Sequence, residues 1–252
     1  TTMGPLVEPA QGKLLRAQSV LASAQDAAGR IPRDSLLKAT AIELVHLATL
    51  VHDDVIDQAD LRRGKPTLRK AYGNKTAVIC GDYLLTQGVR LISGLEGKGK
   101  YLDRKFQDYL ANVCMGELNQ HLNNNNFNLT PLQYFCIING KTAALFEASF
   151  LAGAVTGGEP EAVWKYYRLL GHYIGMIFQM TDDCLDFESD IASSGKNVQS
   201  DYEQNVITLP LVFAFRGNPA FQAMAVQAHQ KGEKLPRTVV NQSVGSSRGL
   251  FL

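Results

Sequence analysis

Hydrophobic positions repeat at helical spacing along most of this chain. The clearest stripe lies between residues 32 and 61, where apolar side chains recur in alternating steps of four and three residues. This spacing places them on one face of an amphipathic helix. The stripe consists of Leu37, Ala41, Leu44, Ala48, Val51 and Val55. No useful length of the chain alternates with the period of two that half-buried strands show, so we predict an all-α protein.

Turn-forming residues separate the other predicted helices, which span residues 75–93, 103–122, 131–155 and 161–187. The turns lie at 62–67, 94–100, 123–126 and 157–160. Thr130 before Pro131 is typical of a helix start, with an N-cap residue followed by proline in the first turn. Residues 189–205 are polar and predicted as a loop, and the tail after Gly217 is too weakly patterned to assign. Because no linker interrupts the chain, we predict one domain over residues 1–252.

Composition narrows the class of protein. Hydrophobic residues make up 45% and charged residues 19%, which is enough apolar material for a sizeable core. The net charge of +1 argues against a general nucleic-acid binder. No apolar run reaches the ~18 residues of a membrane span, and no signal peptide opens the chain. The four cysteines lack metal-binding spacing, so we expect reduced thiols in a cytoplasmic protein. They are Cys80, Cys114, Cys136 and Cys184.

Two aspartate clusters of the form DDxxD carry the strongest chemical signal, at residues 53–57 and 182–186. On a helix the first and last carboxylates of such a cluster lie on nearly the same face, one turn apart. Two carboxylates about 6 Å apart repel by roughly 3 kcal/mol at an effective dielectric constant near 20. One such cluster is most often a solvated helix face. Two copies in apolar helices favour a magnesium–diphosphate site, because Mg²⁺ binds a few carboxylates together with substrate phosphates.

Basic residues accompany both clusters, as phosphate binding requires. Each alone would be interpreted as a solvated surface cation. They are Lys13, Arg16, Arg62, Arg63, Lys141 and Lys196. The helical stripe of Asp53 also carries His46, Thr49 and Asp60, and Gln179 shares a face with Asp182 and Asp186.

Six segments, in this order, resemble the motifs of the trans-isoprenyl (polyprenyl) diphosphate synthases. They are GKLLRA at 12–17, the stretch 42–67 around the first aspartate cluster, GELNQ at 116–120, KTAALFEAS at 141–149, FQMTDDCLDF at 178–187, and 195–210. The resemblance implies a helical bundle of the isoprenoid synthase type with a central active-site cavity. It also implies a medium- or long-chain, hexaprenyl- or heptaprenyl-type enzyme. Such an enzyme condenses isopentenyl diphosphate with farnesyl or geranylgeranyl diphosphate to an all-trans product longer than twenty carbons.

The resemblance also implies residue roles. Magnesium, in three ions once diphosphate is bound, would be held by Asp53, Asp54, Asp57, Asp182, Asp183 and Asp186. The allylic diphosphate would contact Arg62, Lys141, Thr142, Gln179 and Lys196, and isopentenyl diphosphate would contact Lys13, Arg16, His46 and Arg63. The residues implied to be catalytic are Asp53, Asp54, Asp57, Lys141 and Asp182. The proton lost would go to the released diphosphate.

Chain length in this family depends on the residues four and five positions before the first aspartate. Here they are Thr49 and Ala48, both small, so we expect an open tunnel with its floor near Leu84, Leu85 and the helix after Asp103. The alternative for Ala48 is a close-packing helix residue. A Phe or Tyr at Ala48 would then shorten the product.

The chain departs from the family pattern at Gln11, before Gly12, and at Val206, where a lysine is common. It is also shorter than a typical member, so we expect segments to be missing near its ends.

A homodimer, or a heterodimer with a small subunit, remains open, and the product would be delivered to a membrane. Other readings are a short-chain (C15 or C20) synthase, a class I terpene cyclase, a non-catalytic partner subunit and an HD-type metal phosphohydrolase suggested by His52-Asp53. An EF-hand is excluded because its loop pattern is absent.

Overall fold

The computed structural model describes residues 12–93, 99–188 and 200–246. Their contacts group into two compact units. The first unit contains the described residues up to 110 together with 145–172, and the second contains 111–144 together with the described residues from 173 onwards. Three helical stretches contribute to both units. The expectation of a single domain stays a prediction.

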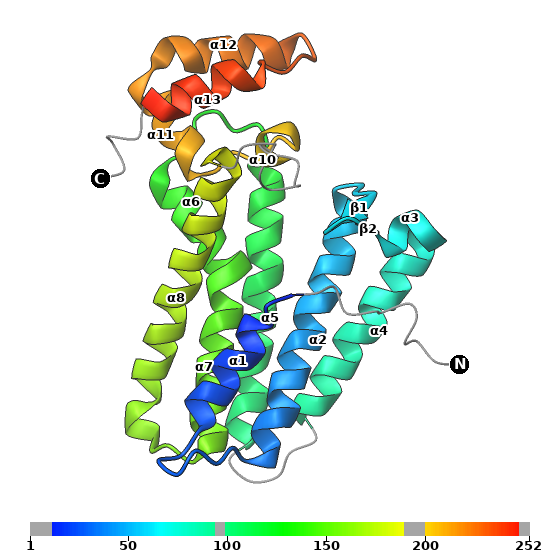
Figure 1. Cartoon of the computed structure of the whole chain (residues 1–252), viewed down its shortest axis with the longest axis vertical. Coiled ribbons are helices and arrows are strands. Elements are labelled where there is room, and N and C mark those ends of the chain that lie inside the picture. Colours follow the sequence, from blue (N-terminus) through cyan, green and yellow to red (C-terminus); the bar gives the residue numbers. More distant parts are fainter. Residues whose placement is uncertain (1–11, 94–98, 189–199, 247–252) are drawn as a thin grey trace. The chain divides into compact units, whose positions relative to one another are not determined.

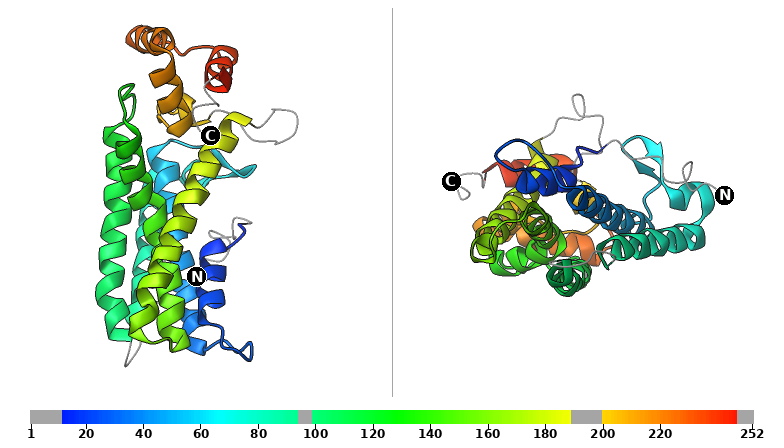
Figure 2. Two further views of the ribbon diagram at one scale, coloured as in Figure 1. Left: turned by 90° about the vertical axis from the view of Figure 1, so that its left-hand side faces the viewer. Right: turned by 90° about the horizontal axis from the view of Figure 1, so that it is seen from below.

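The first unit is built on two neighbouring helices, α2 (Arg33–Ile56) and α4 (Asn74–Ser93), which run side by side in both sets of views (Figures 1 and 2). Helix α1 (Leu15–Ala24) packs against α2. Between α2 and α4 lie a two-stranded antiparallel hairpin, β1 (Leu61–Arg62) and β2 (Lys65–Pro66), and the short helix α3 (Leu68–Tyr72). The unit also includes the start of α5 (Gly99–Leu122), most of α7 (Ala144–Gly157) and the start of α8 (Glu161–Glu188).

The second unit contains the remainder of α5 and α8 together with α6 (Pro131–Ile138) and a π-helical segment, η2 (Asn139–Ala143). In the described residues from 200 to 246 follow α10 (Ser200–Glu203), α11 (Leu209–Gly217), α12 (Pro219–Gln230) and α13 (Arg237–Ser246). Helix α11 contacts α6, α12 and α13, and its buried side chains belong to an apolar core. The α11 residues in that core include Leu211, Val212, Ala214 and Phe215.

The prediction of an all-α protein is confirmed, because the only strands in the described residues are the two short ones of the hairpin. Several boundaries differ. Helix α2 ends at Ile56, before the predicted Leu61, because Asp57 is its C-cap residue and Gln58 adopts a φ of 52°. Helix α5 begins at Gly99, inside the predicted 94–100 turn, whose residues 94–98 lie outside the described ones. Helix α10 lies within the predicted polar loop, and α12 and α13 form in the unassigned tail.

The helix predicted to begin at Thr130 is confirmed at its start. The Thr130 side chain accepts a bond from the Gln133 N–H, and the Gln133 side chain accepts one from the Thr130 N–H. This reciprocal capping fixes the N-terminus of α6. The predicted single helix is interrupted by η2 before it continues as α7. A π-helical turn leaves no trace in apolar spacing, although such turns often lie at functional sites.

The whole helical run from Pro131 to Gly157 is long and apolar enough, by composition alone, to cross a membrane. However, 61% of its most apolar window is buried inside the protein, as is typical of a core helix. No disulfide joins the four cysteines, all of which belong to the described residues.

Candidate active site

In the first unit, Arg16, Arg62 and Arg63 lie near enough to His46 on α2 for their charges to act on it, and these residues form a cationic cluster. Burial and the positive charges of Arg16, Arg62 and Arg63 lower the pKa of His46 to about 3. The imidazole is therefore neutral near pH 7 and can accept one hydrogen bond and donate another without adding charge. Arg16 comes from α1, and the other two arginines come from the β1–β2 hairpin. The structure thus gathers four of the predicted diphosphate contacts in one place.

Arg16 has the strongest requirement for a partner in this cluster. Its Nε atom is buried without a hydrogen-bond partner, and its guanidinium lies 4.8 Å from the centroid of the Phe146 ring. Burial lowers the pKa of Arg16 to about 10, with Glu43 opposing the shift, so the group stays charged at neutral pH. A charged, buried donor without a partner fits an anion. The predicted Lys13 is exposed just before α1.

The first aspartate cluster divides into a buried and a more accessible part. Asp54 is 5% exposed, and the Nε of Arg62 donates to its Oδ1 at 2.8 Å. Burial raises the pKa of Asp54, and Arg62 opposes this rise. Asp53 is half-buried, and Asp57 is exposed at the C-cap of α2. The prediction that Asp60 continues this helical stripe is wrong, because the helix ends before it and Asp60 pairs with residues of α3.

The two predicted chain-length residues lie in different environments. Ala48 is 1% exposed and belongs to an apolar cluster with Val51, Ala77 and Leu84. This is the close-packing arrangement that the sequence left open for Ala48. Thr49 is half-buried, and its hydroxyl donates to the His46 carbonyl at 2.8 Å. A role of either residue in chain length stays a prediction.

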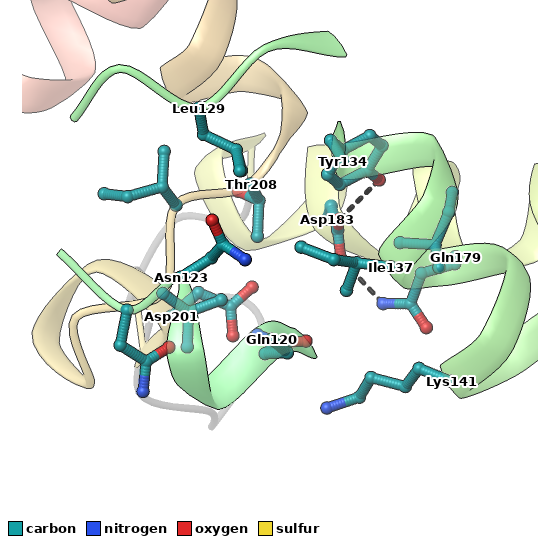
Figure 3. Close-up of a pocket in the computed structure, with 14 residues that line it drawn as sticks. Gln120, Asn123, Leu129, Tyr134, Ile137, Lys141, Gln179, Asp183, Asp201 and Thr208 are labelled. Atoms are coloured by element: carbon teal, nitrogen blue, oxygen red, sulfur yellow. Dashed lines mark hydrogen bonds between the residues drawn. The ribbon is translucent and has the colours of Figure 1, made fainter. Parts of the chain in front are cut away.

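In the second unit, a chain of hydrogen bonds holds the second aspartate cluster (Figure 3). The Tyr134 hydroxyl donates to Oδ2 of Asp183 at 2.6 Å, and Nε2 of Gln179 donates to its Oδ1 at 2.7 Å. The Thr142 hydroxyl, in η2, donates to Oε1 of Gln179 at 2.5 Å. Burial raises the pKa of Asp183 to about 6, against the effect of these donors. With both oxygens bonded, Asp183 fixes the orientation of this face of α8.

Asp201, at the start of the second unit's α10, joins this group of carboxylates. Its N–H donates to Oδ2 of Asp186 at 3.3 Å. Burial, followed by the negative charges of Asp183 and Asp186, raises the pKa of Asp201 to about 8. Asp182, on α8, is exposed. Such crowding of carboxylates disfavours their ionisation and is relieved by a bound cation.

Tyr134, Gln179, Asp183 and Asp201 border a cavity of about 60 Å³ in the second unit (Figure 3). Lys141 also lines it and forms an ion pair with Glu117 at 3.0 Å. Val206, at the position where a lysine was expected, contributes an apolar side chain instead. Lys196 lies outside the described residues. The buried side chains around the cavity include Tyr134, Asp183 and Thr208, and the Thr208 hydroxyl has no hydrogen-bond partner.

Three residues of this site were missed from the sequence, namely Tyr134, Glu117 and Asp201. Glu117 and Asp201 lie in segments that already resembled the family motifs, so their acidic side chains could have been singled out there. Tyr134 gave no signal, because it lies 49 residues from its partner Asp183. Among the described residues, no three His, Cys, Asp or Glu side chains form a metal cluster by themselves. The donor set nevertheless fits a hard cation, because the raised pKa values of Asp183 and Asp201 reflect burial and closely spaced carboxylates.

A family model described as polyprenyl synthetase matches residues 5–243. Heptaprenyl diphosphate synthase component 2 of Geobacillus stearothermophilus is 37% identical over 228 residues, covering 88% of this chain and 70% of that protein. Octaprenyl diphosphate synthase of Haemophilus influenzae is 37% identical over 202 residues, covering 80% and 61%. The chain thus spans less than two thirds of the second relative's length.

A solved structure is similar over almost the whole chain. The heptaprenyl diphosphate synthase of Staphylococcus aureus superposes with a TM-score of 0.81 at 34% identity, covering 94% of this chain and 74% of that one.

Proposed function

The chain belongs to the polyprenyl synthetase family, and from this premise we propose that it is a magnesium-dependent trans-prenyltransferase. It would join isopentenyl diphosphate to an allylic diphosphate and release diphosphate. The family and the helical fold predicted from the sequence are both confirmed. The chain spans less than two thirds of the length of one of these relatives, so the reaction, its substrates and its partners are part of this proposal.

The observation that carries this proposal is the cationic cluster around His46. Arg16, Arg62 and Arg63 are all near enough to His46 for their charges to lower its pKa, and the buried Nε of Arg16 lacks a partner. Such a cluster offers several charge-assisted donors to diphosphate oxygens. Arg16, His46 and Arg63 would hold isopentenyl diphosphate, and Arg62 would reach the allylic diphosphate from its position beside Asp54.

The aspartates would have two kinds of role. We propose Asp53, Asp57 and Asp182 as magnesium ligands, since they are the more accessible carboxylates of their clusters. Magnesium would supply positive charge that stabilises the departing diphosphate. Asp54 would orient Arg62, and Asp183 would orient Gln179 through the contacts described above. Lys141 would neutralise charge on the allylic diphosphate while paired with Glu117.

We also propose a product longer than twenty carbons. Relatives named heptaprenyl and octaprenyl diphosphate synthases support this length. The half-buried Thr49, one turn before Asp53, leaves that level of α2 free of a bulky side chain. For the location we propose the cytoplasm, with product delivered to a membrane.

For the quaternary structure we propose a homodimer. Ile79 and Tyr83 are exposed apolar side chains one turn apart on α4, which supports an association surface. The name "component 2" of one relative favours the alternative of a second, different subunit. Light scattering on the purified chain would distinguish these alternatives. A dimer would support the homodimer, and a monomer would favour association with a second, different subunit.

The decisive experiment is incubation with farnesyl diphosphate, radiolabelled isopentenyl diphosphate and Mg²⁺, followed by chromatography of the dephosphorylated products. We expect labelled all-trans alcohols longer than twenty carbons, and none when a chelator removes Mg²⁺. A chain that binds both diphosphates but makes no product, also in the presence of a relative's small subunit, would contradict the proposed reaction.

A further inference from the structure

The hairpin that carries Arg62 and Arg63 cannot hold its own conformation. Its strands have two residues each, with Leu61 opposite Pro66 and Arg62 opposite Lys65, and so short a pair is unstable alone. The turn residues Arg63 and Gly64 have φ values of 52° and 75°. This pair of positive angles is typical of a type I′ turn. Glycine adopts it freely, but arginine does so only when the surroundings enforce it.

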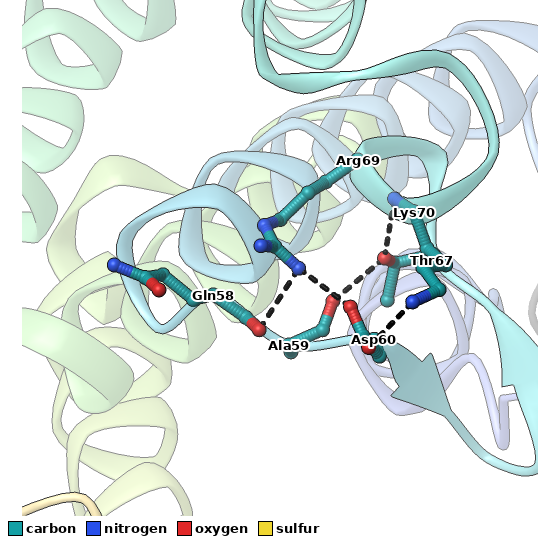
Figure 4. A network of polar contacts seen from close by, with 6 residues as sticks. All are labelled: Gln58, Ala59, Asp60, Thr67, Arg69 and Lys70. Carbon is teal, nitrogen blue, oxygen red and sulfur yellow. Dashed lines mark hydrogen bonds and ion pairs between the residues drawn. The ribbon is translucent and has the colours of Figure 1, made fainter.

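The surrounding support comes from α3, as Figure 4 shows. Nη1 of Arg69 donates to the carbonyl of Gln58 at 2.9 Å and to Oδ1 of Asp60 at 2.7 Å. Nζ of Lys70 donates to the other Asp60 oxygen at 2.8 Å. The Arg69 side chain is only 20% exposed, so its position is restricted. Its two bonds fix the segment between the end of α2 and the start of the hairpin.

Thr67 ties the two ends of the hairpin together. Its N–H donates to the Asp60 carbonyl at 3.0 Å, and its hydroxyl donates to the Ala59 carbonyl at 2.7 Å. The same hydroxyl accepts a bond from the Lys70 N–H at 3.2 Å and so caps α3. Thr67 is 3% exposed, so water competes weakly for these bonds. The residues before and after the hairpin are therefore held to each other and to α3.

We propose that Asp60, Thr67 and Arg69 are positioning residues, a hairpin clamp that sets where the guanidinium groups of Arg62 and Arg63 meet a diphosphate. The clamp does not touch substrate. It fixes the backbone from which both arginines project, and Asp54 then orients Arg62 from the other side. This inference rests on the proposed function, because it assigns the clamp to the binding of that function's diphosphates.

Arg69→Met is the test variant, because it removes both bonds to residues 58 and 60 while keeping a long apolar stem. We expect KM for both diphosphate substrates to rise about tenfold, since a misplaced binding group lowers affinity steeply. We expect kcat to change less and the melting temperature by a few degrees at most, because partly exposed ion pairs contribute little stability. Affinity for inorganic diphosphate with Mg²⁺, measured by calorimetry, should fall in parallel.

The matched control is Arg30→Met, which removes another Asp–Arg ion pair of the first unit. Arg30 pairs with Asp26 at 2.8 Å in the α1–α2 connection, away from the hairpin in sequence, so KM should stay at the wild-type value. Arg69→Lys should recover part of the loss, because an ammonium keeps the charge but not the forked geometry. The double variant Asp60→Asn/Arg69→Met should raise KM by less than the combined effect of the two single variants, since both changes remove the same contact between Asp60 and Arg69.

If KM and diphosphate affinity are unchanged in Arg69→Met, the proposed positioning role of the hairpin clamp is wrong, even if the melting temperature falls. A wild-type chain that binds diphosphate but makes no product would overturn the proposed reaction alone, and weaker diphosphate binding by Arg69→Met would still support the clamp. A wild-type chain without diphosphate affinity would overturn both.

Discussion

The aspartates of the two clusters differ in their exposure to solvent. Asp54 and Asp183 share the sequence pattern of their neighbours, yet both are buried and accept hydrogen bonds from specific partners. Asp53 and Asp182 are more accessible. The accessible members of each cluster are therefore the ones that we expect to bind metal directly.

Replacing Asp182 by Ala should lower kcat at least about hundredfold, because charge stabilisation of the departing diphosphate is lost. The fold should keep its stability, since an exposed carboxylate within a negative cluster is removed. Steady-state kinetics and thermal melting would measure the two effects. Asp108→Ala, at another exposed helical aspartate, serves as control and should be active. Near-wild-type turnover of the Asp182 variant at limiting Mg²⁺ would refute its role as a ligand.

The crowded carboxylate of Asp201 should make stability depend on pH. Its pKa is raised to about 8 in the folded protein, against about 3.9 for an unfolded aspartate. Folding therefore takes up a proton between these values, and the free energy of unfolding contributed by Asp201 falls as pH rises from about 4 to about 8. In a chelating buffer, Asp201→Asn should melt at a higher temperature than wild type at pH 8.5, with the difference vanishing near pH 4. Equal melting curves across this range would show that Asp201 is not crowded.

Helix contacts in the second unit depend on glycine at one close approach. A Cβ added to Gly116 on α5 would lie 2.1 Å from the backbone nitrogen of Lys141 in η2. The π-helical segment that presents Lys141 and Thr142 therefore packs directly on the backbone of α5.

Gly116→Ala should push η2 away, costing roughly 1–3 kcal/mol of stability as in other overpacked sites. Because Lys141 and Thr142 would shift with it, KM for the allylic substrate should rise more than KM for isopentenyl diphosphate. Gly245→Ala is a matched helical control, since nothing lies within 4 Å of its added Cβ. Kinetics unchanged in both variants would contradict this coupling.

The packing of α2 against α4 separates the two chain-length candidates. Ala48 is enclosed in the cluster with Leu84, so Ala48→Phe should destabilise the fold by roughly 1–3 kcal/mol. Thr49 is only half-buried, so Thr49→Phe should keep the fold and shorten the product toward fifteen or twenty carbons. Product chromatography and melting would measure both. An active Thr49→Phe enzyme with unchanged products would disprove the assignment of Thr49 to the tunnel.

At the scale of the whole molecule, each unit carries part of the proposed chemistry. The cationic cluster belongs to the first unit, and the crowded carboxylates with Lys141 belong to the second.

Mg²⁺ and diphosphate together should stabilise the chain more than the sum of their separate effects, because Mg²⁺ in proteins binds carboxylates together with substrate phosphates. At one hundred times the dissociation constant, a ligand that binds only the folded state adds about 2.7 kcal/mol. Thermal melting with Mg²⁺, with diphosphate and with both would measure this, and Ca²⁺ with sulfate provides a control pair. Purely additive shifts would mean that the two bind independently.

The sequence by itself determined the helical class, the position of most helices, the cap at Thr130 and the identity of the charged motifs. These features are local, because apolar spacing, cap residues and turn residues act within a few positions of the chain. The two aspartate clusters and their accompanying cations also pointed to a magnesium–diphosphate site, and six ordered motifs resembled those of the family.

Only the tertiary structure decided which of these residues act as a group. Tyr134 bonds to Asp183, which lies 49 positions away in the sequence. Gly116 lets the π-helical segment that contains Lys141 approach the backbone of α5 closely. The periodicity of apolar residues predicts neither contact. Burial distinguished Asp54 from Asp53 and Ala48 from Thr49, although each pair is adjacent in sequence. Because α2 ends at Ile56, Asp60 does not lie on the helical stripe of the aspartate cluster. It pairs with Arg69 in the hairpin clamp instead. Such differences arise because solvation and distance depend on the neighbours that folding brings together, and these neighbours come from distant parts of the chain.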